Sequence, residues 1–401
     1  MTARAHEAVG FETGERAFVL DPYPVFDELR AVGRPLWHEG LGLWLAFSLA
    51  DADAVLRDRR LGRVYRPREP QEEWDTFNWL HSDSILDSEP PKHTRLRSLV
   101  AKAFARGHVE RLRPRVRELA DGLLDDAAAS GDAFDVLAGY AEPLPVMVIA
   151  ELLGIPESDR YLLRPWSQAI VKMYEYDRTP EHETQAKAAG AEFAAYVSEL
   201  ALTRRTSPGD DLVSHLALVE DGGERLCERE LVATCVLLLN AGHEASVNAF
   251  GNGLVALFRQ PGELARLQAD PWGLAETAVE EFLRFDSPLH LFERTAKQPT
   301  VVGGVEIGAG EKIAALLGSA NRDPRAFDRP AVMDVGRDPN PHLGFGSGIH
   351  FCLGAPLARL ELQISLPLLV ERFPRLALAG DPQLRRTFVL RGYESVPVRL
   401  S

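Results

Sequence analysis

Apolar residues recur at intervals of three and four along most of this chain, which is the spacing of one face of an α-helix. Segment 22–32, for example, places Val25, Phe26 and Leu29 on a single face. The helices that this pattern predicts cover residues 22–32, 112–129, 143–153, 186–205, 228–259 and 355–370. Helix is therefore expected to dominate the fold.

The predicted helix at 228–259 is unusually long and apolar on most of its faces, and Pro261 ends it. At a rise of 1.5 Å per residue it is about 48 Å long. A helix with so little polar surface must cross the centre of the protein. It also contains Gly242, Gly251 and Gly253, which weaken a helix unless close packing against a flat partner offsets the loss.

Strand patterns are fewer and shorter. Strands are predicted at residues 43–47, 300–307, 376–378 and 388–390. Segments 65–84 and 174–183 are expected to be long loops, and long loops are often functional. No repeat or flexible linker divides the chain. We therefore expect a mainly α fold with small β-sheets (α+β) in one integrated domain over residues 1–401.

Composition and charge exclude several classes of protein. With 45 basic and 59 acidic residues, the net charge is 45 − 59 = −14, which disfavours nucleic acid and anionic membranes as partners. Three cysteines do not form a disulfide framework. The N-terminus lacks the apolar core of a signal peptide, and the apolar run near 231–239 is too short to span a bilayer. These observations predict a soluble, cytoplasmic protein without a membrane anchor.

The most informative segment is residues 345–354, with the sequence Phe-Gly-Ser-Gly-Ile-His-Phe-Cys-Leu-Gly. Cys352 lies between glycines, just before a predicted helix. The N-terminal N–H groups and the helix dipole stabilise a thiolate in such a position. A single thiolate held in this way suits an axial haem ligand. The alternative is a buried structural cysteine, which is the usual state of a free cysteine.

This segment resembles the haem-binding loop of the cytochrome P450 family, whose pattern is Phe-Gly-x-Gly-x-His/Arg-x-Cys-x-Gly. The matching residues are Phe345, Gly346, Gly348, His350, Cys352 and Gly354. The resemblance extends over about residues 22–400 and is to the soluble bacterial type. It implies a triangular helix-rich part with a smaller β-rich part. It also implies haem b between the long central helix, near Ala241, and the cysteine loop, with Cys352 as the ligand of the iron.

Other segments match the family in the same order. Its pattern assigns the haem propionates to His93, Arg97, Arg294 and His350. It also implies a structural ion pair between Glu281 and Arg284, which are three residues apart and share one helix face. The Arg-Phe-Asp segment that often joins this pair is replaced by Val-Met-Asp at 332–334. Arg337 is the candidate substitute.

The middle of the long helix resembles the segment of the family that handles oxygen. Gly242 and Glu244 match, but Ala245 replaces the threonine whose hydroxyl helps deliver protons. Ser246 follows, about 100° further around the helix. Three explanations are open: the substrate supplies a hydroxyl or an ordered water, ordinary oxygenation is poorly coupled, or the chemistry needs little protonation. Alternatively, Ala245 only makes room for a bulky substrate. We favour the first.

Family resemblance also gives the substrate pocket. It is expected to be lined by parts of segments 74–86, 171–176, 239–245, 289–292 and 388–390. The chosen residues are Trp79, Asn240, Leu289, His290, Phe292 and Val389. Asn240 and His290 are expected to put polar groups near a medium-to-large, hydroxyl-bearing small molecule of the secondary-metabolite type.

A basic stretch suggests a protein partner. Segment 91–117 carries nine basic residues and one acidic residue, an excess of +8 within an acidic chain. By resemblance it lies on the cysteine side of the haem. Arg106, Arg111 and Arg113 are therefore expected to dock an acidic ferredoxin-type electron donor.

Together these observations predict a haem-thiolate monooxygenase that inserts one oxygen atom from O2 into a C–H bond. The alternatives are an atypical oxidation, such as peroxide-driven turnover, oxidative coupling or ring formation, and a haem-binding sensor without turnover. A non-haem metal site is disfavoured because no Cys/His cluster has suitable spacing.

Overall fold

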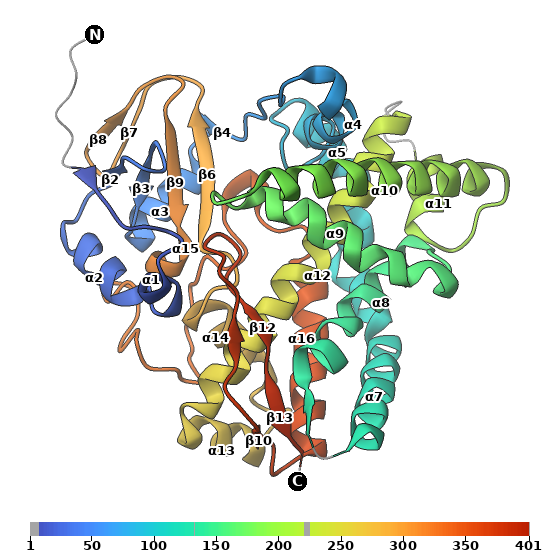
Figure 1. The fold of residues 1–401 in the computed structure, drawn as a ribbon, viewed down its shortest axis with the longest axis vertical. Helices are drawn as coiled ribbons and strands as arrows, with labels where there is room; N and C mark the ends of the chain where they lie inside the picture. The colour runs from blue at the N-terminus through green and yellow to red at the C-terminus, as the bar shows by residue number, and fades with distance from the viewer. Residues whose placement is uncertain (1–7, 132, 220–224, 401) are drawn as a thin grey trace.

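The computed structural model describes residues 8–131, 133–219 and 225–400. A large helical part and a smaller β-rich part lie side by side, and the N-terminal segment belongs to the β-rich part (Figure 1). The longer helices are α2 (Tyr23–Ala31), α3 (Leu49–Arg57), α4 (Gln71–Ser82), α5 (Lys92–Ala101), α7 (Arg113–Ser130), α8 (Pro143–Leu153), α9 (Leu163–Val171), α10 (Pro180–Thr206), α12 (Glu228–Phe258), α13 (Pro261–Ala269), α14 (Ala275–Phe285) and α16 (Ala355–Arg372).

Short helices and turns connect them. The α-helices are α1 (Arg16–Leu20), α6 (Arg106–Val109), α11 (Leu212–Leu218) and α15 (Leu317–Ala320). The remaining turns are η1 (Lys102–Phe104), η2 (Glu110–Leu112), η3 (Leu137–Ala141), η4 (Glu157–Leu162), η5 (Lys172–Tyr174) and η6 (Gly348–His350). The prediction of a mainly α fold with small sheets is confirmed.

The β-rich part is built around a six-stranded sheet in the order β1-β2-β3-β9-β6-β4. Its strands are β1 (Ala8–Val9), β2 (Leu36–His38), β3 (Leu43–Ala46), β4 (Leu61–Gly62), β6 (Leu291–Ala296) and β9 (Lys312–Leu316). β6 pairs antiparallel with β9, with Arg294 opposite Ile313. This pairing places Arg294 near the centre of a strand, where its side chain is 2% exposed.

The other strands form small ribbons. They are β5 (Ala133–Asp135), β7 (Thr300–Val302), β8 (Val305–Ile307), β10 (Ala377–Leu378), β11 (Gln383–Leu384), β12 (Tyr393–Ser395) and β13 (Pro397–Arg399). The strand pattern at 300–307 is a hairpin of β7 and β8. The expected strand at 388–390 makes only an isolated bridge from Leu390 to Leu289, so this prediction is wrong. Three N–H groups of this segment bond to the Glu175 carboxylate instead of to a neighbouring strand.

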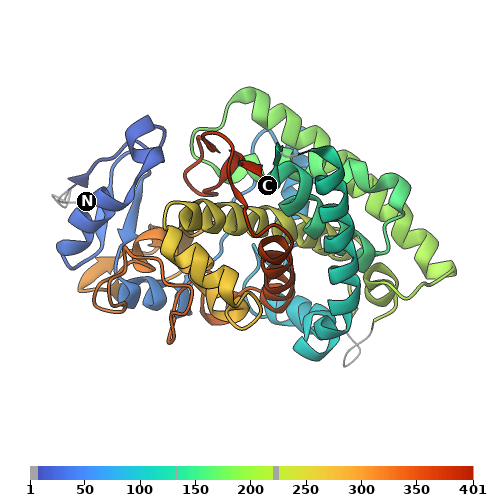
Figure 2. The same ribbon diagram turned by 90° about the horizontal axis from the view of Figure 1, so that it is seen from below.

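Helix α12 crosses the centre of the molecule, as its apolar faces predict (Figure 2). It packs against α4, α8, α9, α10, α14 and α16. Its glycines allow this close packing: a Cβ atom at Gly253 would lie 2.0 Å from the Phe282 ring of α14. The predicted weakening by glycine is thus offset by helix–helix contact.

Two segments expected to be loops are helical in part. Residues 71–82 form α4, because Trp74, Phe77 and Leu80 recur at helical spacing and are buried. The loop predicted at 174–183 ends early, since α10 begins at Pro180 with Thr179 as its N-cap. Many polar residues in both segments obscured the helical period.

Candidate functional site

Cys352 lies immediately before α16, which begins at Ala355. Its N–H donates to the Phe345 carbonyl at 2.9 Å and closes the loop. Gly348 is required here, because its φ is +70° and a Cβ atom would lie 2.5 Å from the Leu56 carbonyl oxygen. Burial raises the pKa of the Cys352 thiol above its ordinary value, and hydrogen bonds from the N–H groups of Gly354 and Ala355 offset only part of this rise. The predicted thiol at a helix start is present, with amide donors directed at its sulfur.

Arg294 is a buried cation beside this loop. No carboxylate of the described residues pairs with it, and its guanidinium donates only to the neighbouring Glu293 carbonyl at 2.9 Å. Its Cζ lies 5.0 Å from the centre of the Phe292 ring. Burial and the nearby charge of Arg63 lower the Arg294 pKa to about 9. A buried arginine in this state indicates a site for an anion.

His93 and Arg97 approach the same region from α5. The Arg97 guanidinium donates to the Phe351 carbonyl at 2.7 Å, next to Cys352. His93 is 2% exposed, and its Nε2 has no partner among the described residues. Burial, together with the charges of His350 and Arg97, lowers the His93 pKa to about 4.

His350 stands beside His93, with 4.4 Å between the ring centres. Its Nε2 lies 3.0 Å from Oε1 of Glu89. The other carboxylate oxygen of Glu89, Oε2, accepts a hydrogen bond from Lys297 at 2.7 Å. Burial alone raises the pKa of Glu89, but these two hydrogen bonds bring it down to about 2. Glu89 is a member of the site that sequence reasoning missed, although it lies only four residues before His93.

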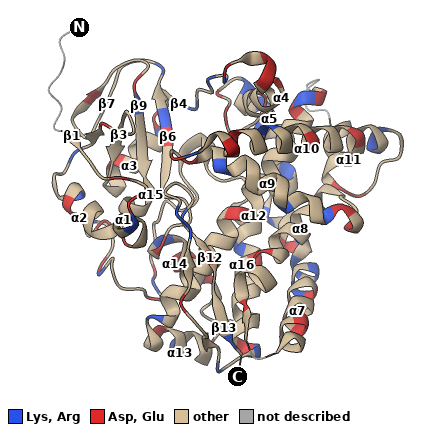
Figure 3. Ribbon diagram, viewed as in Figure 1, with Lys and Arg blue, Asp and Glu red and all other residues tan. Residues whose placement is uncertain are grey.

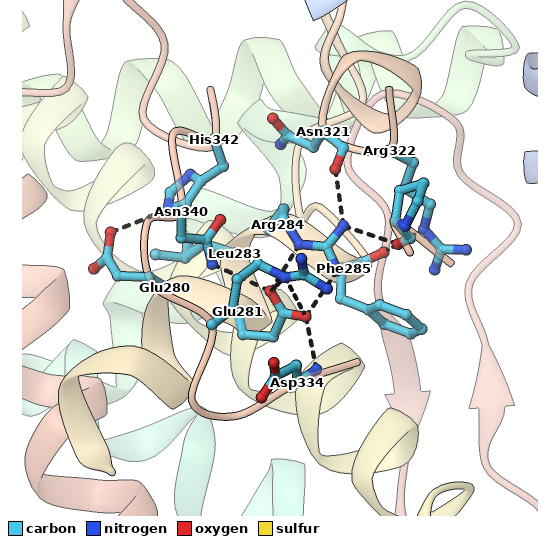
Figure 4. Close-up of polar contacts among 12 residues, drawn as sticks. Glu280, Glu281, Leu283, Arg284, Phe285, Asn321, Arg322, Asp334, Asn340 and His342 are labelled. Atoms are coloured by element: carbon cyan, nitrogen blue, oxygen red, sulfur yellow. Dashed lines mark hydrogen bonds and ion pairs between the residues drawn. The ribbon is translucent and has the colours of Figure 1, made fainter. Parts of the chain in front are cut away.

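Glu281 and Arg284 form a fully buried ion pair with two hydrogen bonds of 2.7 Å (Figure 4). The Glu281 carboxylate also accepts from the Asp334 N–H at 2.9 Å and from Arg337 at 3.1 Å. Arg337 thus takes the place of the arginine missing from segment 332–334. Asn340 adds a fourth donor at 3.1 Å.

The middle of α12 holds the candidate proton relay. Glu244 is buried and forms an ion pair with Arg385, which follows β11. Ser246 turns its hydroxyl back to the Gly242 carbonyl at 3.4 Å, so it does not take over the position of a hydroxyl at residue 245. Ala241 and Ala245 share a helix face, and Ala241 is exposed although most of α12 is buried.

A cavity lies between α4, α9, η5 and α12. The residues that matter for its chemistry are Phe77, Leu80, His81, Tyr174, Ala233 and Asn240. Asn240 was predicted here, but His81 and Tyr174 were not singled out. The helical spacing of Phe77 and His81 is the signal that could have found His81.

Trp79 does not line this cavity. It lies two residues beyond Phe77, which turns it about 200° around α4. Its ring packs instead against Arg229, whose Cζ lies 5.5 Å from the ring centre. The prediction of Trp79 as a pocket residue treated residues 71–82 as a loop, and a loop has no fixed face.

Four other predicted pocket residues also lie away from the cavity around Asn240. His290 is 1% exposed and packs among Phe26, Tyr23 and Phe388, because a neutral ring fits this aromatic cluster. The other three residues that do not line the cavity are Leu289, Phe292 and Val389. Leu289 bridges Leu390, Phe292 lies between Arg63 and Arg294, and the Val389 N–H donates to Glu175.

The basic stretch 91–117 does not remain a +8 surface. Most of its basic side chains form ion pairs with acidic residues, and α7 carries charges of both signs (Figure 3). The pairs are Lys92–Asp83, Arg95–Glu230, Arg113–Glu110, Arg115–Glu151 and Arg117–Asp121. Among the described residues, no carboxylate pairs with Lys102, Arg106 or Arg111. None of the helices in the described residues is long and apolar enough to span a membrane.

A cysteine just before a helix, a buried arginine without a carboxylate among the described residues and an exposed alanine on α12 fit a protein that holds a flat, anionic cofactor. The comparisons agree. The cytochrome P450 family model matches residues 273–387. Cytochrome P450 monooxygenase PikC of Streptomyces venezuelae is 41% identical, covering 95% of this chain and 92% of its own. 6-Deoxyerythronolide B hydroxylase of Saccharopolyspora erythraea is 39% identical, covering 96% and 97%.

A solved structure gives the same result. The crystal structure of P450BioI with acyl carrier protein ligated to hexadec-9Z-enoic acid has a TM-score of 0.91 and 36% identity. The match covers 96% of this chain and 99% of that chain. The chain belongs to the cytochrome P450 family. It is a P450 monooxygenase whose cofactor is haem b.

The residues present fit this cofactor. Arg294 and the unpartnered Nε2 of His93 are groups that buried carboxylates require, and a haem has two propionates. The exposed Ala241 lets a flat ring approach α12. When bound, the haem supplies the activation of dioxygen, while the protein supplies orientation and electrostatics.

Proposed function

We propose that Cys352 is the thiolate ligand of the haem iron and that His93, Arg97, Arg294 and His350 hold the propionates. Phe345, Gly346, Gly354 and Ala241 complete the cofactor site. The observation that carries this proposal is the pair of buried basic groups without anions, Arg294 and His93, beside the cysteine loop. A thiolate ligand gives the iron the electron density that favours O–O cleavage.

The test is Cys352→Ser in the holoenzyme, with Cys227→Ser as the control because Cys227 is exposed and outside the loop. The reduced carbon monoxide complex of the wild type and of the control is expected to show the red-shifted Soret band of a haem thiolate. Loss of that band in Cys352→Ser supports the assignment. An unchanged band rules it out.

The substrate is proposed to be a medium-to-large small molecule of the secondary-metabolite type that carries a hydroxyl group. Two curated relatives support this class: the name of one is 6-deoxyerythronolide B hydroxylase, and another is monooxygenase PikC. The reaction is insertion of one oxygen atom into a C–H bond. Incubation with labelled dioxygen and mass spectrometry of the product test this reaction.

Proton supply is proposed to run from Glu244 through a hydroxyl of the substrate or an ordered water. Glu244 is held by Arg385, Ser246 bonds back to Gly242, and Ala245 offers neither donor nor acceptor. In Ala245→Thr the added hydroxyl is expected to change both the rate and the fraction of electrons that reach product. If rate and coupling are both unchanged, assistance by the substrate is wrong.

The electron donor is proposed to be an acidic ferredoxin-type protein. The supporting surface consists of Lys102, Arg106 and Arg111, which we call the basic patch. It lies near α16, because α6 packs on that helix. Phe351 is 39% exposed next to Cys352 and adds an apolar contact. Arg113, which is paired with Glu110 at 2.8 Å, is expected to contribute less than Arg106 or Arg111.

A second candidate is an atypical oxidation, such as peroxide-driven turnover, oxidative coupling or ring formation. Ala245 favours it, because these reactions depend less on proton delivery. The source of oxygen in the product distinguishes the candidates. Label from dioxygen supports monooxygenation, whereas label from peroxide, or no added oxygen, supports the second candidate.

A further inference from the structure

The cavity between α4 and α12 contains an unsatisfied polar group. Asn240 is 5% exposed, lines the cavity and lies one helical turn before Glu244. Its Oδ1 has no hydrogen-bond partner among the described residues. Buried amide oxygens are almost always paired, and an exception that faces a cavity indicates a ligand with a donor group.

His81 lines the same cavity and is fixed in place. Its ring stacks on Tyr65, with centres 5.2 Å apart and planes 7° from parallel. The Phe77 ring lies 4.5 Å from it on α4. Nδ1 of His81 lies 2.9 Å from Oδ2 of Asp87. A ring held by stacking and by a hydrogen bond can present its second nitrogen in one direction only.

The charge around His81 is balanced. Asp87 forms an ion pair with Arg63 at 2.7 Å. Burial raises the pKa of Asp87, but Arg63 and His81 together bring it well below its usual range. The ionised Asp87 therefore accepts a hydrogen bond from Nδ1–H of His81. In the neutral ring this leaves Nε2 as an acceptor.

We propose that His81 and Asn240 form a polar subsite that binds a neutral hydroxyl group of the substrate. This inference rests on the proposed function, and it assigns the cavity around Asn240 to the substrate site. A hydroxyl donates to one acceptor and can accept from the Asn240 amide. A cationic amine fits less well, because Arg63 already neutralises Asp87. A carboxylate fits less well, because it has no proton to donate to the acceptor atoms Nε2 and Oδ1.

The experiment is an optical titration of the haem-loaded enzyme with cyclododecanol, cyclododecanone and cyclododecane, three probes of similar size. Displacement of the water on the iron reports binding. Because a hydrogen bond to a buried neutral group contributes about 1 kcal/mol, the alcohol is expected to bind about five- to tenfold more tightly than the hydrocarbon. The ketone, which only accepts, is expected to bind less tightly than the alcohol.

Variants assign this preference to the two residues. Asn240→Leu and His81→Phe are each expected to reduce the preference for the alcohol, and the double variant to abolish it. His81→Gln is expected to restore part of it. Trp79→Phe is the matched control, because Trp79 lies on α4 but packs against Arg229.

The outcomes separate the two hypotheses. A haem-thiolate spectrum with no preference for the alcohol, or with a preference that survives in the double variant, overturns the subsite. Failure of all three probes to bind an enzyme with that spectrum also counts against it. Absence of the haem-thiolate spectrum instead overturns the proposed function.

Discussion

Two buried clusters of charge in this protein differ in one respect, which is whether the protein itself supplies the counter-charges. Around Glu281 the charges are paired: Arg284 binds its carboxylate (Figure 4), and Arg337 binds the same carboxylate. Around Arg294 the opposite holds. Arg294 has no carboxylate among the described residues, and Nε2 of His93 has no partner.

The difference separates a structural role from a binding role. Desolvation of a charge is expensive, so a complete cluster is evidence of a self-contained brace. A cluster that lacks counter-charges lowers the stability of the folded protein, because its buried charge is unpaired, and a bound anion removes this loss. The Glu281 cluster is therefore expected to matter for folding with or without haem, and the Arg294 cluster to matter chiefly for haem retention.

The largest effect is expected from Glu281→Gln. This change leaves Arg284 and Arg337 with an uncompensated buried charge, which destabilises a protein by about 3 to 5 kcal/mol. Denaturant unfolding of the haem-free and haem-loaded forms measures it. Glu276→Gln, at an exposed position of α14, is the control and is expected to change little. Equal stability of the two variants would contradict the brace.

The next effect is expected from Arg294→Met. Loss of a hydrogen bond to a charged group weakens binding by about 1.5 to 3 kcal/mol, so haem is expected to leave about ten- to a hundredfold faster. The unfolding free energy of the haem-free form is expected to stay equal or to rise, because a buried unpaired charge is removed. Transfer of haem to an excess of apomyoglobin gives the rate.

Arg57→Met is the matched control for Arg294→Met, because the Arg57 side chain is 65% exposed and paired with Asp53. It is expected to leave haem transfer unchanged. If Arg294→Met destabilises the haem-free form as strongly as it weakens haem retention, the two clusters do not differ in the way proposed.

A smaller effect is expected from pH. The His93 pKa falls from its ordinary value of 6.5 to about 4 in the folded haem-free protein. Between these values the unfolded state binds more protons, so the contribution of His93 is present above pH 6.5 and is lost as pH falls towards 4. A propionate beside His93 would favour its charged form, and the acid loss is expected to shrink when haem is bound.

Unfolding free energies of the wild type and His93→Gln across this pH range, with and without haem, test the expectation. The variant is expected to lose less stability in acid than the wild type in the haem-free form. His215→Gln, at an exposed position, controls for the general effect of removing a histidine. The same pH slope in all three haem-free proteins would count against an unpaired His93.

The smallest effect is expected at the surface, where the same distinction applies. Arg111→Glu changes a cation that no carboxylate of residues 8–131, 133–219 or 225–400 pairs with, whereas Arg115→Glu changes one that is paired with Glu151 at 2.6 Å. Arg111→Glu is expected to slow reduction by an acidic ferredoxin several-fold at low salt and to flatten the salt dependence. Arg115→Glu is expected to change both less. Stopped-flow reduction at several ionic strengths compares them.

Much of the fold, and the cysteine loop of the cofactor site, could be predicted from residues close together in the sequence. Residues 228–259 are apolar on nearly every face, so a central helix is their only stable arrangement, and α12 confirms it within one residue at its end. The loop around Cys352 was found because its glycines and its position before a helix depend on neighbours in the chain. The pair Glu281 and Arg284 was predicted from the resemblance to the family, and its spacing of three residues places both side chains on one helix face.

Long-range contacts could not be found in this way. Segment 71–82 looks polar, and only burial against α10 and α12 makes it a helix with His81 facing the cavity and Trp79 facing away. His290 was expected to line the same pocket as Asn240. Instead it packs against Phe26 and Phe388, away from the cavity that Asn240 lines.

The sequence by itself determined the helical character and the cysteine just before α16, because these follow from periodicity and spacing over a few residues. The basic residues assigned to an anionic cofactor came from the resemblance to the family, which compares the order of motifs along the whole chain. Only the tertiary structure decided which charges are paired. Glu151, which pairs with Arg115, and Glu230, which pairs with Arg95, lie 36 and 135 residues away along the chain. The charge of a segment gives no information about neighbours at such distances. Arg294 is informative for the same reason: the described part of the folded chain brings it no carboxylate.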